Sequence, residues 1–372
     1  MKPTHFIKIL QANRINCFAG VPDSLLKEFC KEISSEELDN LITANEGSAV
    51  AYAAGHYLAT GKLACVYMQN SGQGNAINPL VSLADPAVYS IPMVILIGWR
   101  GQPGVKDEPQ HIKQGQISCD LQNTIGVKTE ILNSKTQAQD IQDLITFAIE
   151  NSQPIAFLVP KNWFEKSEVS FTAKNNFSLF RENVIKKIAN IFRDSAIVST
   201  TGKISRELYE IRNQLDQSHE SDFLTVGSMG HASMIGLGIS QAKPNQQTLI
   251  IDGDGAVLMH MGSLAIIGQS DCRNLKHIVL NNSAHESVGA QPTVADKVNL
   301  TQIARACGYH TISRVTSSND LDKKLIELSQ TQGPAFLEIC VSLKSRSDLG
   351  RPKESPIENK KLFINYLYTK KG

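Results

Sequence analysis

A carboxylate and two carboxamides stand at the ends of two apolar runs in the C-terminal half of the chain. Asp254 lies in a GDG turn after the apolar run 248–251, and Asn281 and Asn282 follow the run 277–280 about 25 residues later. Carboxylate, amide and carbonyl oxygens are hard ligands suited to Mg²⁺ that is shared with phosphate. The glycines let a ligand approach the backbone, and the amides of a following helix attract an anion. The pattern predicts a metal–diphosphate site.

A further acidic group, Glu46, separates the β-rich run 41–43 from the small-residue segment 49–55. An isolated glutamate at such a point is most often a helix N-terminal charge that the helix dipole favours. If Glu46 instead faces a ligand, removal from water would let it hold a proton near neutral pH. An interface on the small-residue segment would supply that desolvation. Glu46 alone does not decide between these interpretations.

Strand-like and helix-like segments alternate along the chain and must position these groups. The alternation stops in the polar stretch 161–178 and then begins again, which predicts an α/β protein with two domains, 1–168 and 178–372, joined by a linker near 165–178. Each domain is expected to be a mostly parallel sheet with helices on both faces. The two domains show no close sequence repeat and are free to share a topology without sharing residues.

Ligands of open α/β sheets bind at the carboxyl ends of the strands. We expect one helix over residues 255–269 to connect the strand before Asp254 to the strand before Asn281, so that both strand ends meet at one edge. A dinucleotide-binding dehydrogenase is disfavoured, because no GxGxxG with a following ribose-binding acid succeeds the first strand.

Charge and composition exclude several classes of protein. Lys and Arg number 37 against 36 Asp and Glu, and no basic run indicates nucleic acid or an anionic membrane. No apolar stretch reaches the roughly 18 residues of a membrane span, and the N-terminus has no apolar signal core. The seven cysteines are scattered without a CxxC pair. We therefore expect a cytoplasmic protein whose cysteines are mostly small core residues.

The motif GDG-x(25)-NN resembles the diphosphate–magnesium motif of thiamine-diphosphate-dependent enzymes. Along nearly the whole chain, the sequence is similar to the phosphonopyruvate decarboxylases of that family, and the sulfopyruvate decarboxylases are near relatives. The segments that carry the resemblance are GVPDSLLKEF, ITANEGSAVAYAAGHYLATGK, YMQNSGQGN, GWRGQPGVKDEPQHIKQGQ, GSMGHAS and NNSAHESVGAQPT. It implies a pyrimidine-binding domain followed by a diphosphate-binding domain, without the middle domain of larger decarboxylases. QNSGQGN lacks the proline that acetolactate-synthase-like enzymes often have after the glycine, which argues against carboligase activity.

The implied reaction is nonoxidative decarboxylation of 3-phosphonopyruvate to phosphonoacetaldehyde and CO₂ in phosphonate biosynthesis. Sulfopyruvate decarboxylation is the near alternative, since phosphonate and sulfonate are alike in shape. A non-catalytic thiamine-diphosphate-binding paralogue is a second alternative. Glu46 argues against it, because in the family this residue drives the cofactor's tautomer shift through N1′ of the pyrimidine, and binding alone does not need that shift.

The resemblance also assigns cofactor and metal ligands residue by residue. Mg²⁺ would be bound by Asp254, Asn282 and the carbonyl of Ala284, with Asn281 shaping the turn. Met229 would support the bent cofactor, although a methionine at this position is otherwise interpreted as an ordinary residue of the hydrophobic core. The remaining residues expected to contact thiamine diphosphate are Glu46, Asn70, Gly227, Ser228, Gly255 and Ala256.

Substrate residues are expected on the loop 98–116 and around it. Asp23, His111 and His285 are the candidates for proton transfer beside Glu46, although Asp23 is also placed to cap the next helix. A phosphonate needs cations or amides, and the candidate substrate-binding residues are Ser24, Ser71, Arg100, Lys106, Arg346 and Arg351. The last two belong to a polar tail that we expect to be a loop or lid. In this family the cofactor lies between domains of different subunits, so we expect a homo-oligomer, at least a dimer, acting on a 2-oxo acid.

Overall fold

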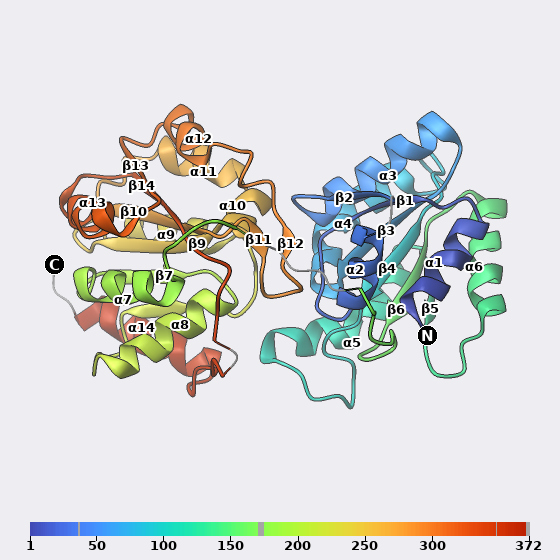
Figure 1. Cartoon of the computed structure of the whole chain (residues 1–372), viewed down its shortest axis with the longest axis horizontal. Coiled ribbons are helices and arrows are strands. Elements are labelled where there is room, and N and C mark those ends of the chain that lie inside the picture. Colours follow the sequence, from blue (N-terminus) through green and yellow to red (C-terminus); the bar gives the residue numbers. More distant parts are fainter. Residues whose placement is uncertain (36–37, 170–174, 347, 370–372) are drawn as a thin grey trace. The chain divides into compact units, whose positions relative to one another are not determined.

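The computed structural model describes residues 1–35, 38–169, 175–346 and 348–369. The chain divides into two compact units (Figure 1), an N-terminal unit of Met1–Thr172 with Val288–Gln291 and a C-terminal unit of Ala173–Ser287 with Pro292–Gly372. Part of the predicted linker, residues 170–174, lies outside the described residues. Within the described part of the chain, no helix is long and apolar enough to cross a membrane.

The described residues of the N-terminal unit form a parallel sheet of six strands in the order β2-β1-β3-β4-β6-β5. Its strands are β1 (Cys17–Gly20), β2 (Asp39–Ile42), β3 (Ala64–Gln69), β4 (Val94–Gly98), β5 (Lys128–Ile131) and β6 (Ile155–Val159). Its helices are α1 (Pro3–Ala12), α2 (Lys27–Ser35), α3 (Glu46–Thr60), α4 (Gln73–Pro79), α5 (Pro109–Thr124) and α6 (Ala138–Asn151), with short turns η1 (Asn70–Gly72) and η2 (Leu80–Ala84).

Apolar side chains cover both faces of this sheet, and its inner strands β4 and β6 are therefore buried along their whole length. On one face, α1, α2 and α6 pack around Phe6, whose ring has edge-on contacts with Phe29 and Phe157. On the other face, α3 and α4 contribute mostly small residues such as Ala53 and Ala76. Small side chains let α3 lie close to the sheet, which fixes the direction of its first residue, Glu46.

The C-terminal unit has a second parallel sheet, with the order β13-β14-β10-β9-β7-β8 in its described residues. Its strands are β7 (Ala196–Ser199), β8 (Asp222–Leu224), β9 (Thr248–Gly253), β10 (Leu275–Asn281), β13 (Thr311–Val315) and β14 (Ala335–Cys340), beside a small ribbon of β11 (Ala284–His285) and β12 (Gln291–Pro292). Its helices are α7 (Arg181–Ile191), α8 (Lys203–Gln214), α9 (Ala232–Ala242), α10 (Asp254–Met259), α11 (Gly262–Gly268), α12 (Leu300–Cys307), α13 (Ser318–Gln330) and α14 (Pro356–Thr369).

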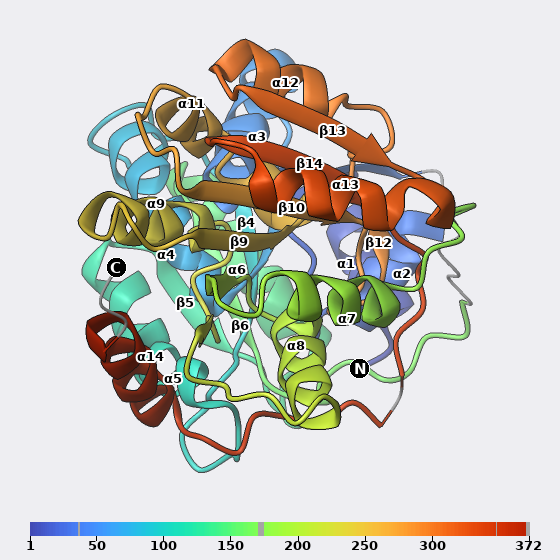
Figure 2. The same ribbon diagram turned by 90° about the vertical axis from the view of Figure 1, so that its left-hand side faces the viewer.

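Helices cover both faces of this sheet as well (Figure 2). The helices α7, α8 and α13 enclose one apolar cluster, and α9, α11 and α12 enclose another on the opposite face. The predicted α/β fold with two mostly parallel sheets is therefore confirmed. The single helix predicted over 255–269 is wrong, because the chain leaves helical geometry at His260 and resumes as α11.

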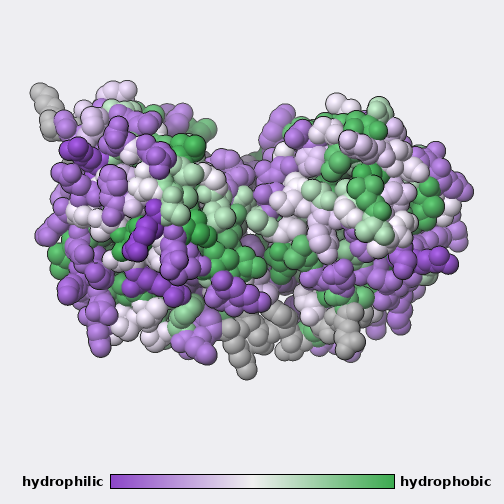
Figure 3. Space-filling view, turned by 90° about the horizontal axis from the view of Figure 1, so that it is seen from above, coloured by the Kyte–Doolittle hydropathy of each residue, from purple (hydrophilic) through white to green (hydrophobic). Residues whose placement is uncertain are grey.

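The two sheets have the same strand order. Read from the opposite edge, the C-terminal sheet is β8-β7-β9-β10-β14-β13, which repeats the order of the first sheet when β7 is matched to β1. The first and third strands of each unit are therefore parallel neighbours, and the order in which successive strands are added to the sheet reverses between them. Such switch points are where open α/β sheets bind ligands. On the surface, hydrophobic groups lie scattered among hydrophilic side chains in both units (Figure 3).

Candidate active site

Asp254 and Asn282 lie together at the carboxyl edge of the C-terminal sheet, as their spacing predicts. β9 and β10 are paired neighbours, and Asp254 and Asn282 follow their ends directly. Asp254 is buried; one of its oxygens accepts from the Thr293 hydroxyl at 2.5 Å and the other from the Asn282 amide at 3.4 Å. These contacts hold the carboxylate in one orientation beside the turn after β10.

That turn is shaped by its two asparagines. The Asn281 side-chain oxygen accepts from the Ser283 amide at 2.9 Å, and its nitrogen donates to Glu338 at 2.7 Å. The Asn282 side-chain oxygen accepts from the Ala284 amide at 3.1 Å, and its nitrogen donates to Glu286 at 3.0 Å. Asn281 thus bends the chain, whereas Asn282 presents its oxygen toward the same turn.

The donor set around Asp254 fits Mg²⁺. Burial raises the pKa of Asp254 to about 6, with hydrogen bonds from Thr293 and the Asn282 amide opposing the rise. Among the described residues, no lysine or arginine forms an ion pair with this carboxylate. A buried anion without a cationic side chain is costly, and a divalent cation would offset that cost. Carboxylate, amide oxygen and the Ala284 carbonyl are appropriate ligands, with phosphate oxygens completing the shell.

Gly255 lies in a tight cradle beside Asp254. A Cβ at Gly255 would lie 3.0 Å from His285 Cε1 and 3.4 Å from Met229 Cε. The sequence-predicted residues Met229, Gly255 and His285 are therefore brought together within this unit. Burial lowers the pKa of His285 to about 4, so its imidazole is neutral at physiological pH. Ala256, the next residue, is buried at the start of α10.

The turn after β8 holds Met229 through unusual backbone geometry. Ser228 has φ +53° and Gly230 has φ +84°, the left-handed region that few residues tolerate. A Cβ at Gly230 would lie 2.5 Å from the His260 ring, so only glycine fits there. Gly227 precedes this turn, and Ser228 is exposed. The turn thus directs the side chain of Met229 toward Gly255. The side chain of Ser228 is exposed and is not held by this packing.

Glu46 is the first residue of α3 and is only 4% exposed. Its Oε2 accepts from Asn75 at 2.7 Å, and a Cβ at Gly72 would lie 2.1 Å from its Oε1. Burial raises the pKa of Glu46, and the Asn75 hydrogen bond opposes the rise. The segment 70–75 therefore desolvates Glu46 within its own unit, without the interface that we expected to supply this desolvation.

The small residues of α3 do not form one packing face. Ala49, Ala53 and Ala54 are buried against the sheet, whereas Ala51 and Gly55 point away from it and are exposed. A Cβ at Gly55 would meet nothing within 4 Å.

Asp23 follows β1 and is fully buried. Its Oδ2 accepts from the Leu25 amide at 2.8 Å, which closes a turn, while α2 begins only at Lys27. The residue therefore does not cap that helix. Its Oδ1 is buried and has no hydrogen-bond partner among the described residues. Burial raises the pKa of Asp23, and Arg100 partly opposes that rise.

Ser24, Arg100 and Lys106 line one pocket of about 220 Å³ in the N-terminal unit, together with Asp107 and Lys161. Arg100 is not a free cation there. Its guanidinium pairs with Asp107 at 2.5 and 2.8 Å and donates to the Ser24 hydroxyl at 2.9 Å. The pocket nevertheless carries three basic side chains against one acidic one, which suits an anion.

The loop predicted over 98–116 is too long, because α5 begins at Pro109. His111 therefore lies in the first turn of this helix. The residue is buried, and burial together with Arg100 lowers its pKa to about 4. It is therefore a neutral imidazole rather than a cation for an anionic substrate. Its Nδ1 has no hydrogen-bond partner among the described residues, which leaves that atom available for proton transfer.

Asn70 holds the loop after β4 in place. Its side-chain nitrogen donates to the Arg100 carbonyl at 2.7 Å and to Ser118 at 2.9 Å, and its oxygen accepts from the Arg100 amide at 3.2 Å. Both donors of Asn70 are thus used inside the protein, where they position this loop; its contact with the cofactor stays a prediction. Ser71 is exposed and accepts from Gln69 at 2.5 Å.

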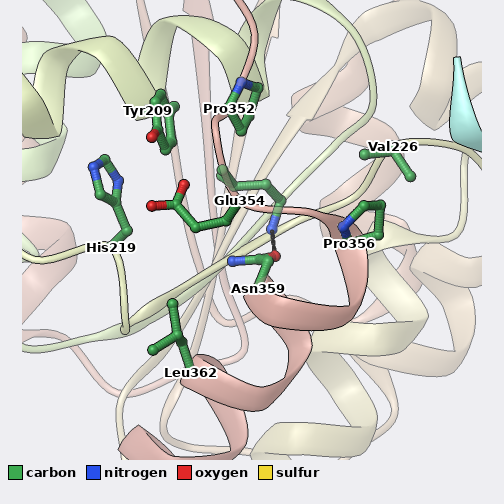
Figure 4. A pocket seen from close by; sticks show the side chains of 9 residues that line it. Tyr209, His219, Val226, Pro352, Glu354, Pro356, Asn359 and Leu362 are labelled. Carbon is green, nitrogen blue, oxygen red and sulfur yellow. Dashed lines mark hydrogen bonds between the residues drawn. The ribbon is translucent and has the colours of Figure 1, made fainter.

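The polar tail lies against the C-terminal unit. Arg346 pairs with Glu182 at 2.7 Å and also with Glu210 and Asp348, so its charge is already balanced and it is not the free anion ligand that we expected. Arg351 is exposed in the same stretch. Figure 4 shows Pro352 and Glu354 of the tail beside Tyr209, His219 and Val226, where the Asn359 oxygen accepts from the Leu224 amide at 3.1 Å.

Comparison with known proteins places the chain. It is 36% identical to the phosphonopyruvate decarboxylase of Streptomyces viridochromogenes over 95% of this chain and 92% of that protein. The chain belongs to this family of thiamine pyrophosphate enzymes. The phosphonopyruvate decarboxylase of Streptomyces hygroscopicus is 34% identical over 95% of this chain and 90% of that protein. The sulfopyruvate decarboxylase of Methanosarcina acetivorans is 28% identical over 98% and 97%.

Two family models match the two units of this thiamine pyrophosphate enzyme. Residues 3–123 match the "Thiamine pyrophosphate enzyme, N-terminal TPP binding domain" and residues 200–339 the "Thiamine pyrophosphate enzyme, C-terminal TPP binding domain". The predicted cofactor, thiamine diphosphate, is confirmed. Four side chains at these sites were not singled out from sequence: Asn75, Asp107, Lys161 and Thr293. Asn75 and Thr293 stand in segments that carry the family resemblance, QNSGQGN and GAQPT, but only the fold shows that they hold Glu46 and Asp254.

Proposed function

We propose that the chain is a phosphonopyruvate decarboxylase, which converts 3-phosphonopyruvate to phosphonoacetaldehyde and CO₂ without net oxidation. The observation that carries the proposal is the buried, desolvated Glu46 in a chain that aligns along nearly its whole length with phosphonopyruvate decarboxylases. A carboxyl group with a raised pKa, held by one amide, is suited to exchanging a proton with a bound heterocycle.

Thiamine diphosphate, when bound, supplies a carbon nucleophile for the keto group and an acceptor for the electrons that CO₂ leaves behind. Asp254, Asn282 and the Ala284 carbonyl would hold its Mg²⁺. The carbonyl of Gly227 and the side chain of Met229 in one subunit, together with Glu46 of another subunit, would orient the pyrimidine.

Two groups of the N-terminal unit are suited to proton transfer at the substrate. Burial raises the pKa of Asp23, and one of its oxygens is buried without a hydrogen-bond partner among the described residues, so it is suited to proton transfer. The pKa of His111 is about 4, so it can accept a proton from a neighbour but does not carry a permanent charge. His285 has the same character in the C-terminal unit. We propose that Asp23 and His111 deliver the proton that replaces CO₂.

The pocket lined by Ser24, Arg100, Lys106 and Lys161 would hold the phosphonate. The Arg100–Asp107 pair orients the guanidinium and fixes the Ser24 hydroxyl, because one donor of Arg100 reaches it at 2.9 Å. Because Asp107 neutralises Arg100, Lys106 and Lys161 contribute the positive charge for the phosphonate. Charge-assisted hydrogen bonds of this kind are worth roughly 1.5–3 kcal/mol each.

We also propose a homo-oligomer that is joined through the outer face of α3. Ala51, Gly55 and Leu58 lie one turn apart on that face, and Leu58 is 72% exposed. Small residues let a second helix approach closely, and burial of Leu58 would add to the stability of the contact. Sedimentation of Leu58→Glu against the parent tests this contact, because a charge in an apolar interface should dissociate the assembly.

One assay separates the proposed reaction from its alternatives. Aldehyde release is measured from phosphonopyruvate, sulfopyruvate and pyruvate side by side, with thiamine diphosphate and Mg²⁺ present. Preference for phosphonopyruvate supports the proposal, preference for sulfopyruvate replaces it with the sulfonate enzyme, and no turnover of any substrate by cofactor-loaded protein refutes it.

The phosphonate pocket is tested by Lys106→Gln and Lys161→Gln. Each should lower kcat/KM for phosphonopyruvate by about ten- to a hundredfold, at roughly 1.4 kcal/mol per decade, and leave pyruvate turnover unchanged. Lys113→Gln is the matched control, because Lys113 lies exposed on α5 and does not line the pocket. Equal losses on both substrates would move the anion site elsewhere.

A further inference from the structure

Three potential metal ligands meet at the amino edge of the N-terminal sheet. Cys17 is the first residue of β1, Asp39 is the first residue of β2 and its direct partner in the sheet, and His56 projects from α3. The Cys17 Sγ, an Asp39 carboxylate oxygen and a His56 ring nitrogen all lie within 4.8 Å of one another. In the described part of the chain, no other three Cys, His, Asp or Glu side chains meet in this way.

The cluster is separate from the proposed active site. Glu46 and Asp23 lie at the carboxyl ends of the strands, whereas Cys17 and Asp39 begin their strands at the opposite edge. His56 follows Glu46 by ten residues on α3, which corresponds to about 15 Å along a helix.

The donor types favour Zn²⁺ over Mg²⁺. Thiolate, imidazole and carboxylate are the ligands of zinc sites, whereas Mg²⁺ takes oxygen ligands in an octahedral shell. Tetrahedral zinc with bonds of about 2.0–2.3 Å sets its ligand atoms roughly 3.3–3.6 Å apart, so the three side chains would have to close by at most about 1 Å. Asp39 is exposed and His56 half-buried, and both are able to rotate toward the cation.

Two of the three ligands, the Cys17 thiol and the Asp39 carboxyl group, are acidic groups on directly paired residues of neighbouring strands. A divalent cation displaces the thiol proton and is attracted by both anions. Tyr52 lies one turn before His56 on α3, and a water would complete the tetrahedral shell.

We propose that Cys17, Asp39 and His56 form a Zn²⁺-binding site with one open coordination position. The bound ion ties together β1, β2 and α3. β2 is an edge strand that pairs only with β1 among the described strands, so the cation fastens the least supported strand of this sheet.

The test is titration of the reduced protein, loaded with thiamine diphosphate and excess Mg²⁺, with Co²⁺ as a spectroscopic probe. We expect one equivalent of Co²⁺ to give a thiolate-to-cobalt charge-transfer band and the intense visible bands of four-coordinate cobalt, and Zn²⁺ to abolish both. Co²⁺ at the diphosphate site has oxygen ligands and gives no thiolate band. Absence of the thiolate band in the parent protein overturns the proposal.

Variants assign the ligands. Cys17→Ser should lose the charge-transfer band, and Asp39→Asn and His56→Gln should weaken Zn²⁺ binding by on the order of tenfold or more. Cys119→Ser is the matched control, since this partly exposed cysteine of α5 lies outside the cluster. A band that persists in Cys17→Ser and disappears in Cys119→Ser refutes the assignment. Because Asp39 is exposed, Asp39→Asn is expected to fold. This variant keeps the test decisive if Cys17→Ser does not fold. Unchanged Zn²⁺ affinity in Asp39→Asn also refutes the assignment.

Discussion

Gly72→Ala tests whether the position of Glu46, rather than its mere presence, supports activity. The added methyl would lie 2.1 Å from Glu46 Oε1, 2.4 Å from Cδ and 2.6 Å from Cγ. Ordinary contact begins at 3.4 Å, so the carboxyl group must move by 1.3 Å, the difference between 3.4 and 2.1 Å. The 2.7 Å hydrogen bond from Asn75 cannot follow such a shift unchanged.

A misplacement of about 1 Å in a reacting group costs on the order of a hundredfold in rate, or about 2.7 kcal/mol. We therefore expect kcat of Gly72→Ala to fall about a hundredfold. Exchange of the C2 proton of bound thiamine diphosphate, followed by quenched-flow NMR, should slow by a similar factor, while retention of the cofactor changes little.

Gly74→Ala is the matched control. It lies two residues away on α4, and a Cβ there meets nothing within 4 Å, so activity should be retained and stability should rise by roughly 0.5–1 kcal/mol. The reasoning is refuted if Gly72→Ala is folded by circular dichroism, retains its thermal midpoint and turns over within twofold of the parent.

The remaining predictions concern the metal, the acid group and the core. Asp254→Ala should abolish Mg²⁺-dependent binding of thiamine diphosphate in calorimetry, because it removes the anionic ligand, and Asn282→Ala should weaken binding less; parent-like affinity of Asp254→Ala would disprove the metal site. Glu46→Gln should bind the cofactor yet lose about 10²–10⁴ in turnover, and near-normal C2-proton exchange would remove Glu46 from the mechanism. Arg212→Ala should lower the free energy of unfolding by about 3–5 kcal/mol in urea titration, because the buried Asp222, which it contacts at 2.8 and 2.9 Å, would keep an unpaired charge; a loss below 1 kcal/mol would contradict this.

The alternation of strands and helices was sufficient to predict both sheets, because parallel strands buried on both faces appear as short continuous apolar runs. The meeting of Asp254 and Asn282 was also predictable, since both follow strand ends and carboxyl ends share one edge. The break at His260 was not, because the helical pattern continues through it while Gly230 packs against the His260 ring. Tertiary contact, rather than propensity, ends that helix.

The least predictable features are pairings between distant segments. The cationic character of Arg100 is clear from sequence, but its neutralisation by Asp107 depends on the fold of the loop. The same holds for His111, whose charge is removed by burial at the start of α5. Residue type sets what a side chain is able to do, and burial then selects which of those properties it keeps.

The common strand order of the two units bears on how the gene arose. Glu46 and Met229 both follow the second strand of their unit, and Asn70 and Asp254 both follow the third. Duplication of one ancestral segment, followed by divergence, accounts for this correspondence without any residual sequence repeat. In such a history, the corresponding positions specialised. The end of the third strand kept an acid for the metal in one unit, at Asp254, and acquired an amide that anchors a loop in the other, at Asn70. Residues of the two halves can therefore be compared by strand number, and a reconstructed single-unit ancestor would be expected to act only as a paired copy of itself.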